Sequence, residues 1–110
     1  MWNEIQDKQK MLDKAIETFA QNGYDLAMKE KKYKIALNKR ALELRSQDMP
    51  VTLINQIIYG VPEVAEKRYK RDIAETMYNT NQEHINATKL KLRLLEGQLS
   101  REWGNINNEN

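Results

Sequence analysis

Few side chains in this sequence have the chemistry of a catalytic or metal site. The 110 residues contain one histidine, His84, and no cysteine. The lack of cysteine excludes disulfides, thiolate metal sites and cysteine nucleophiles. His84 has neither a second histidine nor a Glu-x-x-His pair with which to complete a metal site, so we interpret it as an ordinary histidine. We expect no metal and no cofactor.

The remaining candidates for catalysis fall in one turn of a predicted helix. Asp72 and Glu75 share this turn with Arg68 and Arg71. Carboxylates at this spacing from guanidinium groups form ion pairs on a helix surface, and we prefer this interpretation to acid–base catalysis. The sequence has neither a glycine-rich phosphate loop nor a Gly-x-Ser-x-Gly motif. We therefore expect a protein that is not an enzyme.

Positive charge is concentrated in the middle of the chain, although the formal net charge is only +2. Residues 29–72 hold eleven Lys or Arg and six Asp or Glu. A chain reversal within this segment would make one end of the molecule basic. A basic end can contact nucleic-acid phosphates without reading bases, and a solvated helix surface is the alternative. The residues predicted to contact phosphates are Lys31, Lys34, Arg40, Arg68 and Arg71.

The segment 46–62 must position these side chains. It contains both prolines of the chain, Pro50 and Pro62, which disfavour a continuous helix before them and suit a helix start after them. We expect a short helix near 51–59, whereas its β-branched residues make a strand over 51–58 the alternative. The aliphatic residues expected to be buried here are Leu53, Ile54, Ile57 and Ile58.

Apolar residues on both sides of this connector recur at spacings of three, four and seven, as in amphipathic helices. The pattern predicts helices over 2–47 and 62–103. The first keeps its phase across Gly23, which favours one continuous helix, and a kink or break at the turn signal Asn22-Gly23 is the alternative. Reversal at the connector makes the two helices antiparallel, in an all-α hairpin. The predicted seam of the second helix is Ala74, Tyr78, Asn81, Ile85, Thr88, Leu92, Leu95 and Leu99.

A chain of this length accommodates one domain. Gly104 is the predicted end of the second helix, so we expect residues 1–104 to form a single helical-hairpin domain and residues 105–110 a disordered polar tail. No apolar run approaches the roughly 18 residues of a membrane span, and the polar N-terminal residues do not resemble a signal peptide. Together with the lack of cysteine, this leads us to expect an intracellular protein with no membrane contact.

Each long helix carries a second apolar stripe, which a single partner helix cannot cover. This pattern predicts that two or more copies assemble into an oligomeric helical bundle, and scattered surface residues are the alternative. The expected oligomer contacts are Tyr24, Met28, Ile35, Leu42, Leu90 and Leu94.

A helix-turn-helix motif over 52–71 is disfavoured. Such a motif needs a small buried residue where this chain has Gln56, and an apolar one where it has Glu66. Burial of these polar groups without partners would be unfavourable.

Three segments of the chain carry a likeness to known sequences. They are Leu44-Arg45 with Met49-Pro-Val-Thr-Leu-Ile54, Arg71-Asp-Ile-Ala-Glu75 with Tyr78, and Leu94-Leu-Glu96 with Arg101-Glu-Trp-Gly104. Together they resemble a family of small helical proteins from phages and prophages of Gram-positive bacteria. The chain departs from this likeness at Asp48, where we expect a glycine. The resemblance implies a viral or prophage accessory protein that acts in the cytoplasm of a bacterial host cell, and it implies no particular activity.

We expect a non-enzymatic phage-type accessory protein whose helix faces bind a phage protein, a host protein or further copies of the chain. The alternative is a nucleic-acid-associated accessory protein that binds phosphates through the basic end near the connector.

Overall fold

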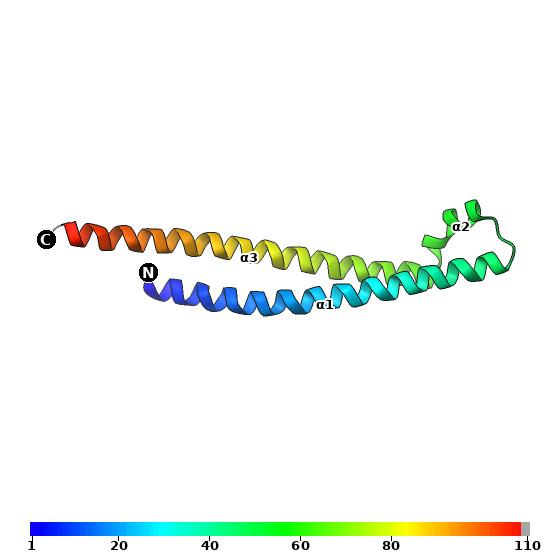
Figure 1. Cartoon of the computed structure of the whole chain (residues 1–110), viewed down its shortest axis with the longest axis horizontal. Coiled ribbons are helices and arrows are strands. Elements are labelled where there is room, and N and C mark those ends of the chain that lie inside the picture. Colours follow the sequence, from blue (N-terminus) through cyan, green and yellow to red (C-terminus); the bar gives the residue numbers. More distant parts are fainter. Residues whose placement is uncertain (109–110) are drawn as a thin grey trace. The chain divides into compact units, whose positions relative to one another are not determined.

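The computed structural model describes residues 1–108, and the protein is all-helical over them (Figure 1). The elements are α1 (Trp2–Ser46), α2 (Val51–Ile57), the 3₁₀ helix η1 (Ile58–Gly60) and α3 (Pro62–Asn108). The long helices α1 and α3 pack together as a hairpin, and α2 and η1 connect them. This confirms the predicted all-α class. No described residue lies in a strand, so the alternative of a strand over 51–58 is wrong.

Helix α1 continues through Gly23, as its unbroken apolar phase predicted. A Cβ atom at Gly23 would lie 3.3 Å from Cε2 of Tyr78. The bare backbone of Gly23 therefore gives the ring of Tyr78 room to pack closely, which offsets the lower helix propensity of glycine.

Helix α1 ends in a left-handed turn at Asp48, which has a φ of 63°. The amide of Asp48 donates to the carbonyl oxygen of Arg45 at 3.0 Å, and the amide of Met49 donates to that of Leu44 at 3.2 Å. These bonds satisfy carbonyls at the helix end, where glycine is the usual residue. Aspartate tolerates this conformation better than most residues, so the turn forms without the expected glycine.

The protein divides into two compact units, and unit 1 contains Met1–Gln21 and the chain from Asn79 onward. Asn81 lies in this unit, and its Nδ2 donates to the carbonyl oxygen of Ala15 at 3.1 Å. Early α1 residues meet late α3 residues here, so the two helices are antiparallel. The buried core of unit 1 is Ile5, Leu12, Ala15, Ile85 and Leu92.

Unit 2 contains Asn22–Tyr78, which includes the connector. Its buried core takes residues from every element, namely Tyr33 and Leu44 from α1, Ile54 from α2, Ile58 from η1 and Val64 from α3. The connector thus closes the apolar end of the helix pair. Only two of its four central aliphatic residues are buried, since Leu53 and Ile57 remain 41% and 39% exposed.

Helix α3 runs to Asn108, so the predicted end at Gly104 is wrong. A glycine commonly ends a helix by adopting a left-handed conformation, and Gly104 does not have a positive φ. Residues 105–108 of the predicted tail are helical, and 109–110 lie outside the described residues. That residues 1–104 form a single domain stays a prediction. In the part of the chain that the structure describes, no helix has the length and apolar character needed to cross a membrane.

Candidate functional site

The candidate functional sites of this protein are exposed surfaces of its two long helices. Within residues 1–108, no group of three or more His, Cys, Asp or Glu side chains is placed to hold a metal ion. The single histidine, His84, is exposed on α3. The candidate site is therefore built from the charged and apolar residues that the two long helices present.

Arg71 is the centre of a charged cluster within unit 2. Its Nη1 lies 2.9 Å from Oε2 of Glu30 on α1, and its Nε lies 2.8 Å from Oδ1 of Asp72. The guanidinium group also lies 4.8 Å from the centre of the Tyr33 ring, a favourable cation–π distance. With its side chain only 19% exposed, Arg71 joins α1 to α3 and its charge is already matched by carboxylates.

The ion pair between Arg71 and Glu30 changes the protonation of both groups. The hydrogen bond from Arg71 lowers the pKa of Glu30 below its ordinary value of 4.5. The hydrogen bonds to Glu30 and Asp72 in turn raise the pKa of Arg71. The folded state therefore favours the charged form of each partner.

We expect the Glu30 carboxylate to stabilise the protein at neutral pH and not in acid. Because the folded pKa of Glu30 is lowered, its contribution is present above the unfolded pKa and is lost as the pH falls through the folded value. Glu30→Gln should lower the free energy of unfolding by about 0.5–1 kcal/mol at pH 7, the range of a partly exposed pair. At pH 3 the loss should be smaller.

Urea unfolding followed by circular dichroism at the two pH values measures this difference. Asp25→Asn is the matched control, because the Asp25 carboxylate pairs with Lys29 of its own helix, Oδ1 to Nζ at 3.5 Å, and not with the opposing helix among the described ion pairs. A loss for Glu30→Gln that is equal at pH 7 and pH 3 would contradict the assigned role of the carboxylate.

Two of the other predicted phosphate contacts are paired on α1 itself. Nη1 of Arg40 lies 2.9 Å from Oε2 of Glu43, and Nζ of Lys34 lies 3.4 Å from Oε1 of Glu30. These ion pairs partly neutralise the charges of Arg40 and Lys34, so each would attract a phosphate group less strongly.

The last two predicted phosphate contacts are more open. Arg68 is exposed, and its guanidinium group lies 5.2 Å from the centre of the Tyr59 ring. Lys31 is exposed and forms no ion pair within 4.0 Å with a described residue. The five residues therefore belong to unit 2 but do not form one free basic cluster.

The predicted oligomer contacts on α1 form an exposed apolar stripe in unit 2. Tyr24, Ile35 and Leu42 are 72%, 56% and 72% exposed, and Met28 is half-buried. At about 100° per residue they lie opposite the buried face of α1. We call Tyr24, Met28, Ile35 and Leu42 the α1 stripe.

Lysine residues surround the α1 stripe. Lys31 lies between Met28 and Ile35 in the stripe, and Asn38 lies between Ile35 and Leu42. With these two residues included, successive positions of the stripe are four and three residues apart, as in the seam of a coiled coil. Lys32 and Lys39 follow one flank of the stripe. Both are exposed, and no ion pair within 4.0 Å joins either to a described residue. The α1 stripe is therefore an apolar surface in a positively charged setting.

The predicted contacts on α3 lie in unit 1. Leu90 and Leu94 are 52% and 64% exposed, whereas Leu92 between them is buried in the core. The structure thus leaves both predicted stripes uncovered, and it places them in different units.

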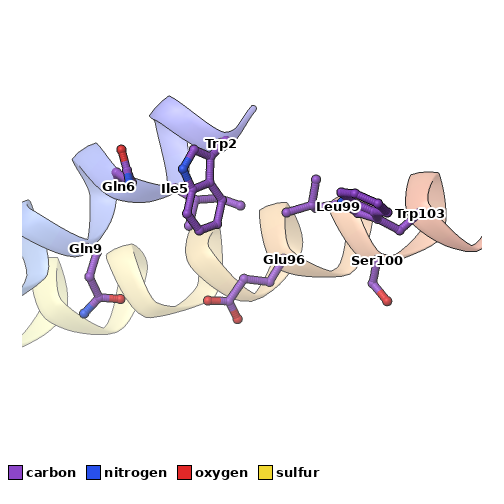
Figure 2. A pocket seen from close by; sticks show the side chains of 8 residues that line it. All are labelled: Trp2, Ile5, Gln6, Gln9, Glu96, Leu99, Ser100 and Trp103. Carbon is purple, nitrogen blue, oxygen red and sulfur yellow. The ribbon is translucent and has the colours of Figure 1, made fainter.

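An apolar groove in unit 1 was missed by the sequence patterns. Its lining includes Trp2 and Ile5 of α1 and Leu99 and Trp103 of α3 (Figure 2). The volume of the groove is about 570 Å³. Both tryptophans are exposed, Trp2 at 60% and Trp103 at 61%. The available signal was one tryptophan near the outer end of each long helical pattern, because antiparallel pairing brings such ends together.

Comparison with known proteins finds no matching family, no matching curated protein and no matching solved structure.

Proposed function

We propose that the chain is a non-enzymatic, phage-type accessory protein that binds an acidic amphipathic helix of a phage or host protein through the α1 stripe. The observation that carries the proposal is an exposed apolar stripe of coiled-coil spacing among lysines that form no ion pair within 4.0 Å with any residue that the structure describes.

The apolar residues of the stripe supply the driving force for binding. Full burial of one large apolar side chain contributes about 1.5–3 kcal/mol, and Tyr24, Ile35 and Leu42 are all more than half exposed. An amphipathic helix of the partner would cover these side chains by coiled-coil packing, which the spacing of four and three residues favours.

The lysines determine the charge of the partner. Pairing of the stripe with the same stripe of another copy would bring together two sets of Lys31, Lys32 and Lys39, and like charges across a seam are unfavourable. Acidic residues beside the apolar positions of a different helix would instead form ion pairs with these lysines. The charges thus favour a partner other than a second α1 stripe.

The same lysines bear on the alternative of phosphate binding. A nucleic acid would contact Lys31, Lys32 and Lys39 but would leave the apolar residues between them without apolar neighbours. Arg71, one of the five predicted phosphate contacts, is engaged by Glu30 and Asp72. A protein helix therefore uses more of this surface than a phosphate backbone does.

The proposal is tested by affinity capture from a bacterial host lysate, with and without nuclease. The wild-type chain should retain a nuclease-resistant partner, and Ile35→Asp with Leu42→Asp should lower its recovery at least tenfold, because a tenfold loss corresponds to only about 1.4 kcal/mol. Replacement of Lys31, Lys32 and Lys39 by Glu should also lower it. Ile16→Asp is the matched control, since Ile16 is a 47% exposed residue of the same helix.

Two results would refute the proposal. One is a partner that the Ile35→Asp, Leu42→Asp chain captures as well as the wild type. The other is the loss of every partner after nuclease treatment, which would assign the basic surface to nucleic acid. Unchanged helical circular dichroism in each variant ensures that lost capture does not reflect unfolding.

A further inference from the structure

A second exposed seam lies on α3 within unit 1. Its residues alternate by four and three along the helix, and we call them the α3 seam: Glu83, Ala87, Leu90, Leu94, Gly97 and Arg101. Gly97 is half-buried and the other five are exposed. Such a seam normally packs against another helix, and the buried residues of unit 1, such as Ile85 and Leu92, lie on a different face of α3.

The α3 seam is self-complementary when two copies run antiparallel. In a pairing centred between Leu90 and Leu94, each of these leucines faces the other leucine of the second copy. Ala87 then faces Gly97 of the second copy, where two small residues let the backbones approach. Glu83 faces Arg101 of the second copy, so that opposite charges close both ends of the contact.

The terminal charges of the seam are available for this contact. Neither Glu83 nor Arg101 forms an ion pair within 4.0 Å with a described residue. Nη1 of Arg101 lies 3.8 Å from the position that a Cβ atom would take at Gly97, so the guanidinium group lies along the seam. A parallel pairing would instead place Glu83 against Glu83 and Arg101 against Arg101, which is unfavourable.

We infer that the α3 seam binds the α3 seam of a second copy of this chain in antiparallel orientation. The charges within the seam distinguish this surface from the α1 stripe, because the α3 seam carries an acid and a base at its two ends, whereas the α1 seam positions carry Lys31 and no acid. Lys91 and Arg93 flank the leucines near the centre of the contact, and Lys91 lines a groove with Glu4, Asp7 and Lys8. The inference does not rest on the proposed function, because the two use residues of different units.

The mass of the full chain in solution tests the inference. Light scattering or sedimentation equilibrium at tens of micromolar should give twice the 13.0 kDa chain mass, and Leu90→Asp with Leu94→Asp should give the single-chain mass. Ile16→Asp is the control and should keep the dimer. A single-chain mass for the wild type overturns the inference.

Charge reversal tests the register without disturbing the leucines. Glu83→Arg alone and Arg101→Glu alone should each raise the dimer dissociation constant about tenfold, since each places like charges at both ends of the contact. The two reversals combined restore opposite charges and should return the constant to within about threefold of the wild type. Additive weakening in the double variant overturns the antiparallel register.

The lack of native cysteine allows a direct test of orientation. A mixture of Ala87→Cys and Gly97→Cys chains should form a mixed disulfide under oxidation. Ala87→Cys alone should not, because the two copies of position 87 would be about 15 Å apart along the helix axis, and a disulfide requires Cα atoms within about 7 Å. Efficient self-crosslinking of Ala87→Cys, with no mixed product, would refute the pairing.

Discussion

Leu44→Ala is expected to lower the free energy of unfolding by about 2–5 kcal/mol, the usual cost of removing a large buried aliphatic side chain. Leu44 is only 3% exposed. It lies in the core of unit 2, where α1 meets the connector and the start of α3. The cavity left by the substitution would remove contacts with three helical elements at once. Urea unfolding monitored by circular dichroism measures the loss.

Leu42→Ala provides the matched control, because it is the same substitution two residues away on a side chain that is 72% exposed. We expect a change within about 0.5 kcal/mol, as for most surface substitutions. If the two variants lost similar amounts of unfolding free energy, Leu44 would not face the core while Leu42 faces solvent, and the described orientation of α1 would be wrong. Leu42→Ala should instead weaken capture of the partner of the α1 stripe.

Arg71→Glu is expected to lower the free energy of unfolding by about 2–3 kcal/mol. The substitution removes the contact with the Tyr33 ring and the ion pair with Glu30, and loss of one member of a partly buried pair is unfavourable. It also places a carboxylate beside Glu30, Asp72 and Glu75, which now face a positive charge. Thermal and urea unfolding both report the effect.

Arg68→Glu makes the same change of charge three residues earlier, and we expect it to cost less than about 1 kcal/mol. Arg68 is exposed, and its recorded contact is with the Tyr59 ring, which contributes about 0.5–1 kcal/mol at an exposed site. Equal effects of the two reversals would contradict the position of Arg71 between α1 and α3. Because Arg71 has this structural role, Lys31 is the better residue for a test of phosphate binding.

The sequence by itself determined the helical elements. A helix of 3.6 residues per turn brings residues three and four apart to one face. The apolar spacing therefore predicted both long helices and the face of α3 that packs on α1, where Ala74, Ile85, Thr88 and Leu92 are buried. The two prolines predicted the connector, because proline restricts its own backbone and that of the preceding residue. This effect, like helix periodicity, depends only on residues that are near one another in the sequence.

Tertiary structure decided which side chains of the connector are buried. Leu53, Ile54, Ile57 and Ile58 look alike in sequence, and only Ile54 and Ile58 turn toward the core of unit 2. The rotation of a helix as short as α2 is set by the elements on which it packs. Its own spacing does not contain that information.

Tertiary structure also decided the partners of the charged residues. Arg71 and Glu30 are 41 residues apart in sequence and 2.9 Å apart in the fold, and only the register of α1 against α3 brings them together. The sequence grouped Arg71 with Lys31 as a candidate phosphate contact and did not identify Glu30 as its partner, because local spacing shows which face a residue occupies but not which residue of the opposing helix lies against it. The sequence therefore suffices to find an exposed stripe and the lysines beside it. Whether those residues contact another part of the same chain depends on how the two helices pair.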